Sequence, residues 1–143
     1  MSKDSIKIER VFDAPVEKVW EALTNENKMK QWYFPDIEFK PIVGHVTEFN
    51  VHHDGKDFFH IWKVTEVKPV EKIAYEWHYR GYPGNSLLSF SLENIQDEKT
   101  RVTLLHEHLE SFLPDQNPNL SSDNFTEGWT NFIDSRLRDF LER

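Results

Sequence analysis

The sequence contains no cysteine and no long apolar run. The absence of cysteine excludes disulfides, thiolate nucleophiles and cysteine-ligated zinc, and it fits a reducing compartment. No apolar stretch approaches the roughly 20 residues that a membrane-spanning helix needs. The opening residues, Met1 to Ile6, lack the hydrophobic core of a signal peptide. We therefore expect a cytoplasmic protein without a membrane span.

Basic residues are also scarce, with 17 Lys and Arg against 25 Asp and Glu, which gives a net charge of −8. A dedicated nucleic-acid-binding protein needs a basic surface to contact phosphates, so this class is excluded. The same acidic balance disfavours docking on anionic membranes.

Aromatic residues, in contrast, are abundant, with 11 Phe, 5 Trp and 4 Tyr in 143 residues. Rigid rings bring large apolar faces and leave gaps between them. Composition alone leaves two interpretations open, a solid aromatic core and a lined cavity. The length suits one domain over residues 1–143, large enough to bury a core without disulfides or metals.

The N-terminal part of the chain predicts one strand and two short helices. Ile6 and Ile8 alternate with charged residues, which is typical of a half-buried strand over residues 5–12. Pro15 suits the first position of a helix, and apolar residues follow it at helical spacing. A second short helix is expected over residues 28–32.

The middle of the chain has an apolar period of two, which indicates β-strands. Asp54-Gly55 is a strong β-hairpin signal, and Gly81–Asn85 is a dense cluster of turn residues. His106 and His108 would share one face of the last strand. The expected strands cover residues 45–53, 58–67, 73–79, 88–92 and 102–108.

The C-terminal segment predicts the longest helix of the chain, with Ser121-Ser122-Asp123 as capping residues. Its apolar stripe must be buried, and the sheet is the only large partner. We therefore predict an α+β fold in which a curved antiparallel sheet wraps around this helix. The stripe consists of Phe125, Trp129, Phe132, Ile133, Leu137 and Phe140.

Four features of the sequence occur in the order seen in one known superfamily. They are Ile8–Thr24 with Pro15 and Trp20 inside it, Trp32 at the end of the second helix, Val64–Trp77 with Val67 and Pro69, and Gly128-Trp129 before Phe132 and Leu137. Together they resemble the START-like, or SRPBCC, superfamily, and most of all the activators of heat-shock-protein-90 ATPase homologues, the AHSA family. The resemblance spans almost the whole chain. It implies the helix-grip fold, with a cavity between the sheet and the last helix.

The candidate ligand site is the apolar lining of that cavity. We expect Trp32 and Phe34 near its mouth, and an entrance beside the loop 112–119. The alternative is that all these side chains pack solidly. The candidate residues are Trp32, Phe49, Val51, Trp62, Tyr75, Trp77, Leu88, Phe90, Leu104, His106, Phe125, Trp129, Phe132 and Ile133.

No metal site, cofactor site or catalytic motif is predicted. His52 and His53 are adjacent on a strand and point to opposite faces, so they cannot easily chelate one ion. The sequence has no His-Glu-x-x-His, Gly-x-Ser-x-Gly or phosphate-binding loop. Glu66 and Glu76 would serve as an acid or base only if they were buried with a raised pKa. We expect them instead to face solvent or to pair with Arg or Lys. His106 is either a ligand contact or a hydrogen-bonded structural histidine, the interpretation that we prefer.

The predicted function is non-catalytic binding of a small hydrophobic or amphipathic molecule, such as a lipid, a sterol or a polyketide-like compound. The resemblance implies two alternatives. One is a stress-associated partner of a chaperone, which predicts an exposed apolar patch outside the pocket. The other is a cyclase or hydrolase that acts on a hydrophobic substrate. We expect a monomer or a weak dimer.

Overall fold

In the computed structural model, which describes residues 5–53 and 55–142, six strands form one antiparallel sheet in the order β1-β6-β5-β4-β3-β2. Each strand pairs with its neighbour in the chain except β1, which pairs with β6. The strands are β1 Ile6–Phe12, β2 Val46–His53, β3 Lys56–Lys68, β4 Lys72–Tyr79, β5 Ser86–Gln96 and β6 Lys99–Glu107.

The helices include the long C-terminal helix that the apolar stripe predicts. Its parts follow one another without a break, and we call them together the C-terminal helix, Ser122–Leu141. The Ser121 hydroxyl accepts a hydrogen bond from the Asn124 amide at 3.3 Å and caps the first turn. The helical elements are α1 Val16–Thr24, α2 Glu26–Trp32, η1 Leu109–Phe112, η2 Pro118–Leu120, α3 Ser122–Thr130, the π-helical η3 Asn131–Leu137 and α4 Arg138–Leu141.

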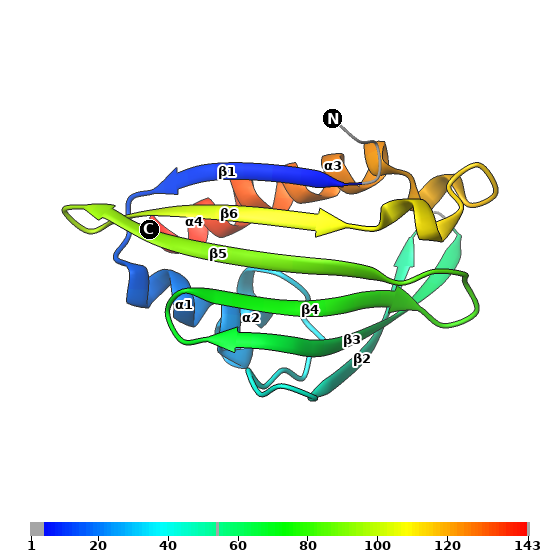
Figure 1. Ribbon diagram of the computed structural model, residues 1–143, viewed down its shortest axis with the longest axis horizontal. Coiled ribbons are helices and arrows are strands. Elements are labelled where there is room, and N and C mark those ends of the chain that lie inside the picture. The colour runs from blue at the N-terminus through cyan, green and yellow to red at the C-terminus, as the bar shows by residue number, and fades with distance from the viewer. Residues whose placement is uncertain (1–4, 54, 143) are drawn as a thin grey trace.

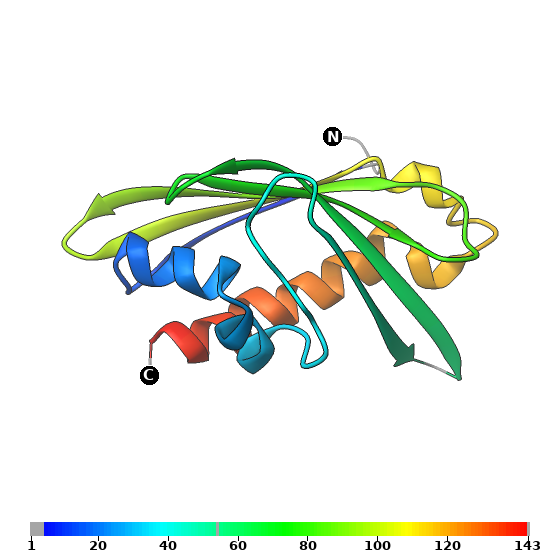
Figure 2. The same ribbon diagram turned by 90° about the horizontal axis from the view of Figure 1, so that it is seen from below.

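All the helices that pack on the sheet lie on one of its faces (Figure 1, Figure 2). The C-terminal helix runs along this face, with α1 and α2 beside its C-terminal half. The β2–β3 hairpin leaves the plane of the sheet and bends down beside the N-terminal half of the helix, as Figure 2 shows. Strand twist produces this curvature. The α+β helix-grip prediction is confirmed.

Two local predictions are wrong. Strand β6 ends at Glu107, and His108 has a φ of 67° at the start of η1, so its side chain does not share the face of His106. Pro15 is the N-cap residue before α1 and not the first residue of the helix, because its backbone is extended, with a ψ of 154°. The β2–β3 hairpin pairs down to His53 and Lys56, while Asp54 lies outside the described residues. Among the described residues, no helix is both long and apolar enough to cross a membrane.

Candidate ligand-binding site

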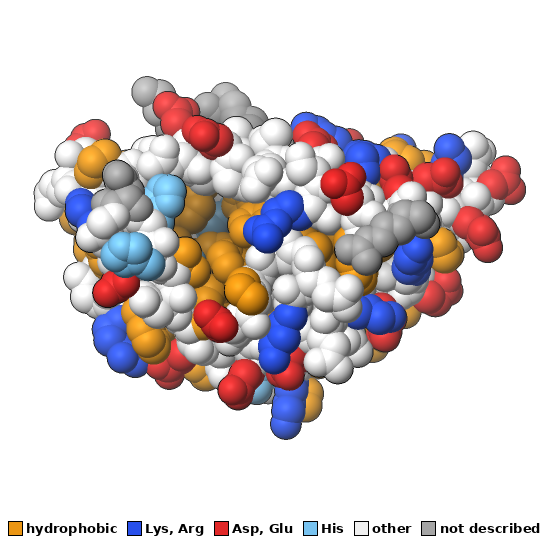
Figure 3. All heavy atoms as spheres, turned by 180° about the vertical axis from the view of Figure 1, so that it is seen from behind, with side chains coloured by type: hydrophobic (Ala, Val, Ile, Leu, Met, Phe, Trp, Pro, Cys, Tyr) orange, Lys and Arg blue, Asp and Glu red, His pale blue; other side chains and the backbone are white. Residues whose placement is uncertain are grey.

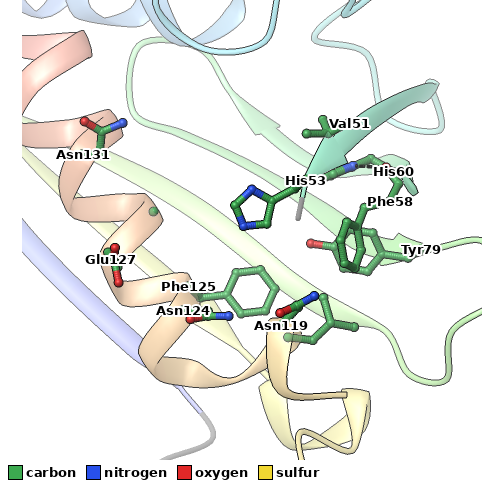
Figure 4. Close-up of a pocket in the computed structure, with 12 residues that line it drawn as sticks. Val51, His53, Phe58, His60, Tyr79, Asn119, Asn124, Phe125, Glu127 and Asn131 are labelled. Carbon is green, nitrogen blue, oxygen red and sulfur yellow. Dashed lines mark hydrogen bonds between the residues drawn. The ribbon is translucent and has the colours of Figure 1, made fainter. Parts of the chain in front are cut away.

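A cavity of about 520 Å³ lies between the end of the β2–β3 hairpin and the N-terminal half of the C-terminal helix. Figure 3 shows this side of the molecule hollowed, with hydrophobic side chains inside the hollow and histidines beside it. Figure 4 shows the lining residues. They are Val51, His53, Phe58, His60, Tyr79, Asn119, Leu120, Asn124, Phe125, Glu127, Gly128 and Asn131.

The helix contributes one continuous face to the wall. Asn124, Gly128 and Asn131 follow one another at spacings of four and three residues, which places them on the same side of a helix. Gly128 is the middle member, and a Cβ added there would meet no atom within 4 Å. The cavity therefore extends up to the helix backbone at this position.

His60 in β3 is the most buried histidine of the lining, with 5% of its surface exposed. Its ring lies flat against Phe49, with centroids 4.7 Å apart. Its Nδ1 lies 2.9 Å from the Phe58 carbonyl oxygen, and since a carbonyl only accepts, Nδ1 donates. Burial lowers the pKa of His60 to about 4. The ring is thus neutral at pH 7, with a lone pair on Nε2.

Tyr79 in β4 brings a hydroxyl group to the same wall (Figure 4). Its oxygen accepts a hydrogen bond from Trp77 Nε1 at 2.7 Å. Burial raises the pKa of Tyr79, so the hydroxyl keeps its proton.

The loop wall of the cavity is anchored to the sheet. The Ser111 hydroxyl accepts from the Asn85 amide at 3.0 Å and lies 2.9 Å from the Asn85 carbonyl. Gly84 has a φ of 93°, and a Cβ there would lie only 2.3 Å from the Ser111 carbonyl oxygen. These contacts hold the segment that leads to Asn119 and Leu120 against the end of the sheet.

A second cavity of about 370 Å³ lies on the other side of Val51. The exposed Arg136 side chain borders it, with its guanidinium 5.5 Å from the centroid of Phe132. The Arg136 guanidinium thus lies over an aromatic face, as in a cation–π contact. This cavity is lined by Tyr33, Phe34, Pro35, Asp36, Phe49, Asn50, Val51, Phe132 and Arg136.

Four of the fourteen candidate residues line one of these two cavities: Phe49, Val51, Phe125 and Phe132. The other ten have at most 3% of their surface exposed and pack in the core. These ten are Trp32, Trp62, Tyr75, Trp77, Leu88, Phe90, Leu104, His106, Trp129 and Ile133.

The segment Trp32–Phe34 fills the space beside several of these residues. The Tyr33 ring stacks on Trp32 at 4.5 Å and lies 6.0 Å from Trp129 and 5.4 Å from Trp62. It therefore fills the space between the sheet and the middle of the C-terminal helix. Trp32 is 1% exposed and does not stand at a cavity mouth, whereas Phe34 lines the smaller cavity.

His106 belongs to a buried hydrogen-bond chain. Trp129 Nε1 donates to His106 Nδ1 at 3.1 Å, so His106 Nε2 carries the proton and donates to Ser86 Oγ at 2.8 Å. Ser86 in turn donates to the Trp77 carbonyl at 2.6 Å. Burial lowers the pKa of His106 to about 3. With both ring nitrogens bonded, His106 connects the helix to β4 and β5 and has no free atom for a ligand.

Glu66 does not have the raised pKa that the catalytic alternative requires. Lys72 and Lys68 lie 3.1 and 3.4 Å from Glu66 and lower the pKa of its carboxyl group. The expected pairing of Glu66 with basic residues is thus confirmed, and its pKa is lowered rather than raised. Glu76 accepts from the Asn85 side chain at 3.0 Å.

Within residues 5–53 and 55–142, no three His, Asp or Glu side chains are grouped as a metal site requires. His52 instead contacts Asp57, with 2.9 Å between Nδ1 and Oδ1.

Sequence reasoning missed several lining residues, of which Tyr79 and Gly128 are the most informative. Tyr79 continues the alternation of Tyr75 and Trp77, so the pattern could have included it. Glycine destabilises the interior of a helix, so its occurrence at Gly128 could have indicated a position with a role other than helix formation. No local pattern marks Asn119, Asn124 or Glu127 as lining.

Among curated proteins, none matches the chain. Its fold is similar to that of protein MLL2253 from Mesorhizobium loti, with 26% identity, 97% of both chains covered and a TM-score of 0.75. It is also similar to the Aha1 dimer from Colwellia psychrerythraea, with 25% identity, 96% of both chains covered and a TM-score of 0.70.

DynU16, from the dynemicin biosynthetic locus, shares the fold at 23% identity and a TM-score of 0.77, with 99% of this chain and 48% of DynU16 covered. Residues 13–142 match the family described as Activator of Hsp90 ATPase homolog 1-like protein. Because this match spans most of the sequence and the fold agrees with it, the chain belongs to the Activator of Hsp90 ATPase homolog 1-like family.

Proposed function

We propose that this protein binds a small, mainly apolar molecule in the larger cavity, between the β2–β3 hairpin and the C-terminal helix. The observation that carries the proposal is the cavity itself. Its volume of about 520 Å³ is of the size that small-molecule sites have, and its lining combines apolar walls with a few polar groups, as such sites do. The relation in fold to DynU16, from a biosynthetic locus, supports a small organic ligand.

Burial of apolar surface would supply most of the affinity. Covering 200 Å² of a ligand contributes roughly 5 kcal/mol at about 25 cal/mol per Å², before the entropy costs of binding. The rings of Phe58 and Phe125 provide such surface on opposite walls. The anchored loop at Ser111 keeps the cavity formed without a ligand, which lowers the cost of ordering it.

A pair of substitutions at Gly128 tests this site. Gly128→Leu places a side chain in the open space and is expected to weaken binding of N-phenyl-1-naphthylamine, a neutral fluorescent probe, at least tenfold. Gly128→Ala leaves most of the space free and should bind the probe like wild type. It should also stabilise the fold by about 0.5–1 kcal/mol, since alanine favours a helix.

Fluorescence titration gives the affinities, and chemical-shift perturbation gives the location. Shifts at Phe125, Gly128 and Tyr79 would support the cavity as the site. Equal affinity in the Gly128→Leu variant, or shifts confined to other residues, would contradict the proposal.

Partnership with a chaperone is a second candidate, favoured by exposed apolar residues outside both cavities. Val46 is 47% exposed at the start of the edge strand β2, and Ile42 and Val43, in the turn before it, are 60% and 61% exposed. Exposed apolar clusters commonly contact other proteins. Such a partner would fit the role in stress that the family resemblance implies, and the cytoplasmic location that we expect from the sequence.

The ATPase rate of a purified Hsp90-type chaperone tests this candidate. Wild-type protein should change the rate, and the double substitution Ile42→Asp and Val43→Asp should abolish the change. Leu113→Asp is the matched control, because Leu113 is similarly exposed at 44% but lies on another loop. No effect of the wild-type protein, or an unchanged effect of the double variant, would exclude this surface.

A further inference from the structure

We infer that the larger cavity selects a ligand with an uncharged hydroxyl group, an alcohol or a phenol, on its apolar body. The inference rests on the proposed function and narrows its ligand class. It follows from polar groups on two largely buried side chains of the wall, His60 and Tyr79, which have unused hydrogen-bonding capacity as one acceptor and one donor.

The acceptor is Nε2 of His60. Since Nδ1 donates to the Phe58 carbonyl, Nε2 carries no proton. The structure gives Nε2 no hydrogen-bond partner among the described residues, although His60 is 95% buried. The contacts of the ring on its faces and edges are aromatic, with Phe49, Trp77 and Tyr79. A ligand donor would satisfy this lone pair.

The donor is the hydroxyl hydrogen of Tyr79. An indole N–H can only donate, so in the 2.7 Å bond with Trp77 the Tyr79 oxygen is the acceptor. The structure gives the hydroxyl no other hydrogen bond among the described residues, and Tyr79 is 5% exposed. Its proton is thus left for a ligand acceptor. The rings of His60 and Tyr79 are neighbours, with centroids 4.7 Å apart.

A hydroxyl group is the smallest group that both donates and accepts, so it matches this pair. A pure hydrocarbon would cover the His60 lone pair and the Tyr79 hydroxyl hydrogen without giving either a hydrogen-bond partner, which is unfavourable. A carboxylate lacks the donor that His60 Nε2 needs. None of the twelve lining residues is Lys or Arg, and Glu127 adds a negative charge, so a buried anion would also lack a counterion.

Four naphthalene derivatives of nearly the same shape separate these cases: 2-naphthol, 2-methoxynaphthalene, naphthalene and 2-naphthoate. We expect wild-type protein at pH 7 to bind 2-naphthol at least tenfold more tightly than naphthalene. The methyl ether accepts but cannot donate, so it should bind more weakly than 2-naphthol. The carboxylate should bind most weakly. Dissociation constants come from chemical-shift titrations that follow Phe125 and Gly128.

Two variants assign the preference to the two atoms. His60→Phe keeps a ring against Phe49 and removes the acceptor, and Tyr79→Phe removes the donor. Each should reduce the ratio of naphthalene to 2-naphthol dissociation constants toward one, while naphthalene still binds. Tyr82→Phe is the matched control, because Tyr82 stacks on Phe58 at 5.5 Å but does not line the cavity. It should keep the wild-type ratio.

The outcomes separate this inference from the proposed function. Equal binding of naphthalene and 2-naphthol to the wild-type protein overturns the hydroxyl preference and leaves an apolar site. An unchanged ratio in both His60→Phe and Tyr79→Phe also overturns it. Failure of all four compounds and of N-phenyl-1-naphthylamine to bind overturns both proposals. If Tyr79→Phe does not fold, the His60→Phe ratio against wild type decides.

Discussion

Replacing Trp129 by alanine is expected to lower the free energy of unfolding by about 3–5 kcal/mol. The indole is 2% exposed and contacts the rings of Trp77, Phe90 and Phe132. Its removal leaves a hole that these rigid rings cannot easily close. It also takes the donor from His106 Nδ1, which becomes a buried unpaired acceptor. Urea denaturation at pH 7 measures the change.

Trp129→Phe separates packing from hydrogen bonding at the same position. Phenylalanine keeps most of the aromatic contact but has no N–H, so the loss should be smaller, about 1–3 kcal/mol. A nearly neutral Trp129→Ala variant would mean that Trp129 borders empty space or water. That result would place open space around Trp129 itself, in the N-terminal half of the helix.

Acidification from pH 7.5 to pH 5.0 is expected to remove about 4 kcal/mol of stability, about 2 kcal/mol from each of His60 and His106. Burial lowers the folded-state pKa values to about 4 and about 3, below the 6.5 of an ordinary histidine. The unfolded chain therefore binds more protons in this window, so stability is present above pH 6.5 and is lost as the pH falls.

His60→Phe provides the control for this pH dependence. The variant removes one of the two buried titrating groups and keeps an aromatic ring, so its loss over the same interval should be only about 2 kcal/mol. Denaturant titrations at both pH values give these differences. An equal loss in wild type and His60→Phe would show that His60 titrates alike in both states.

The two buried histidines illustrate how similar residues take different roles. Both are neutral and lie on the inner face of the sheet. His106 has bonds on both nitrogens, to Trp129 and Ser86, and so connects the helix to the sheet. His60 has one bonded nitrogen, its other nitrogen has no hydrogen-bond partner among the described residues, and its side chain lines the cavity. The different roles of the two histidines thus depend on the residues that surround each of them in the fold.

The sequence by itself determined the elements, the fold and the family. The alternation of Tyr75, Trp77 and Tyr79 placed all three on the buried face of β4, and the stripe from Phe125 to Phe140 identified the C-terminal helix. These predictions succeeded because periodicity is a local property of a chain: it depends on residues two or four positions apart.

Only the tertiary structure decided where the cavity lies. Tyr33 and its neighbours fill the space beside Trp129, while the β2–β3 hairpin bends away and leaves room beside Gly128. Tyr33 and Trp129 are far apart in the chain, and no local period relates them. Which side chain occupies a given volume depends on sheet curvature and on packing between such distant segments. The position and the polar atoms of the site therefore emerge only when these segments meet.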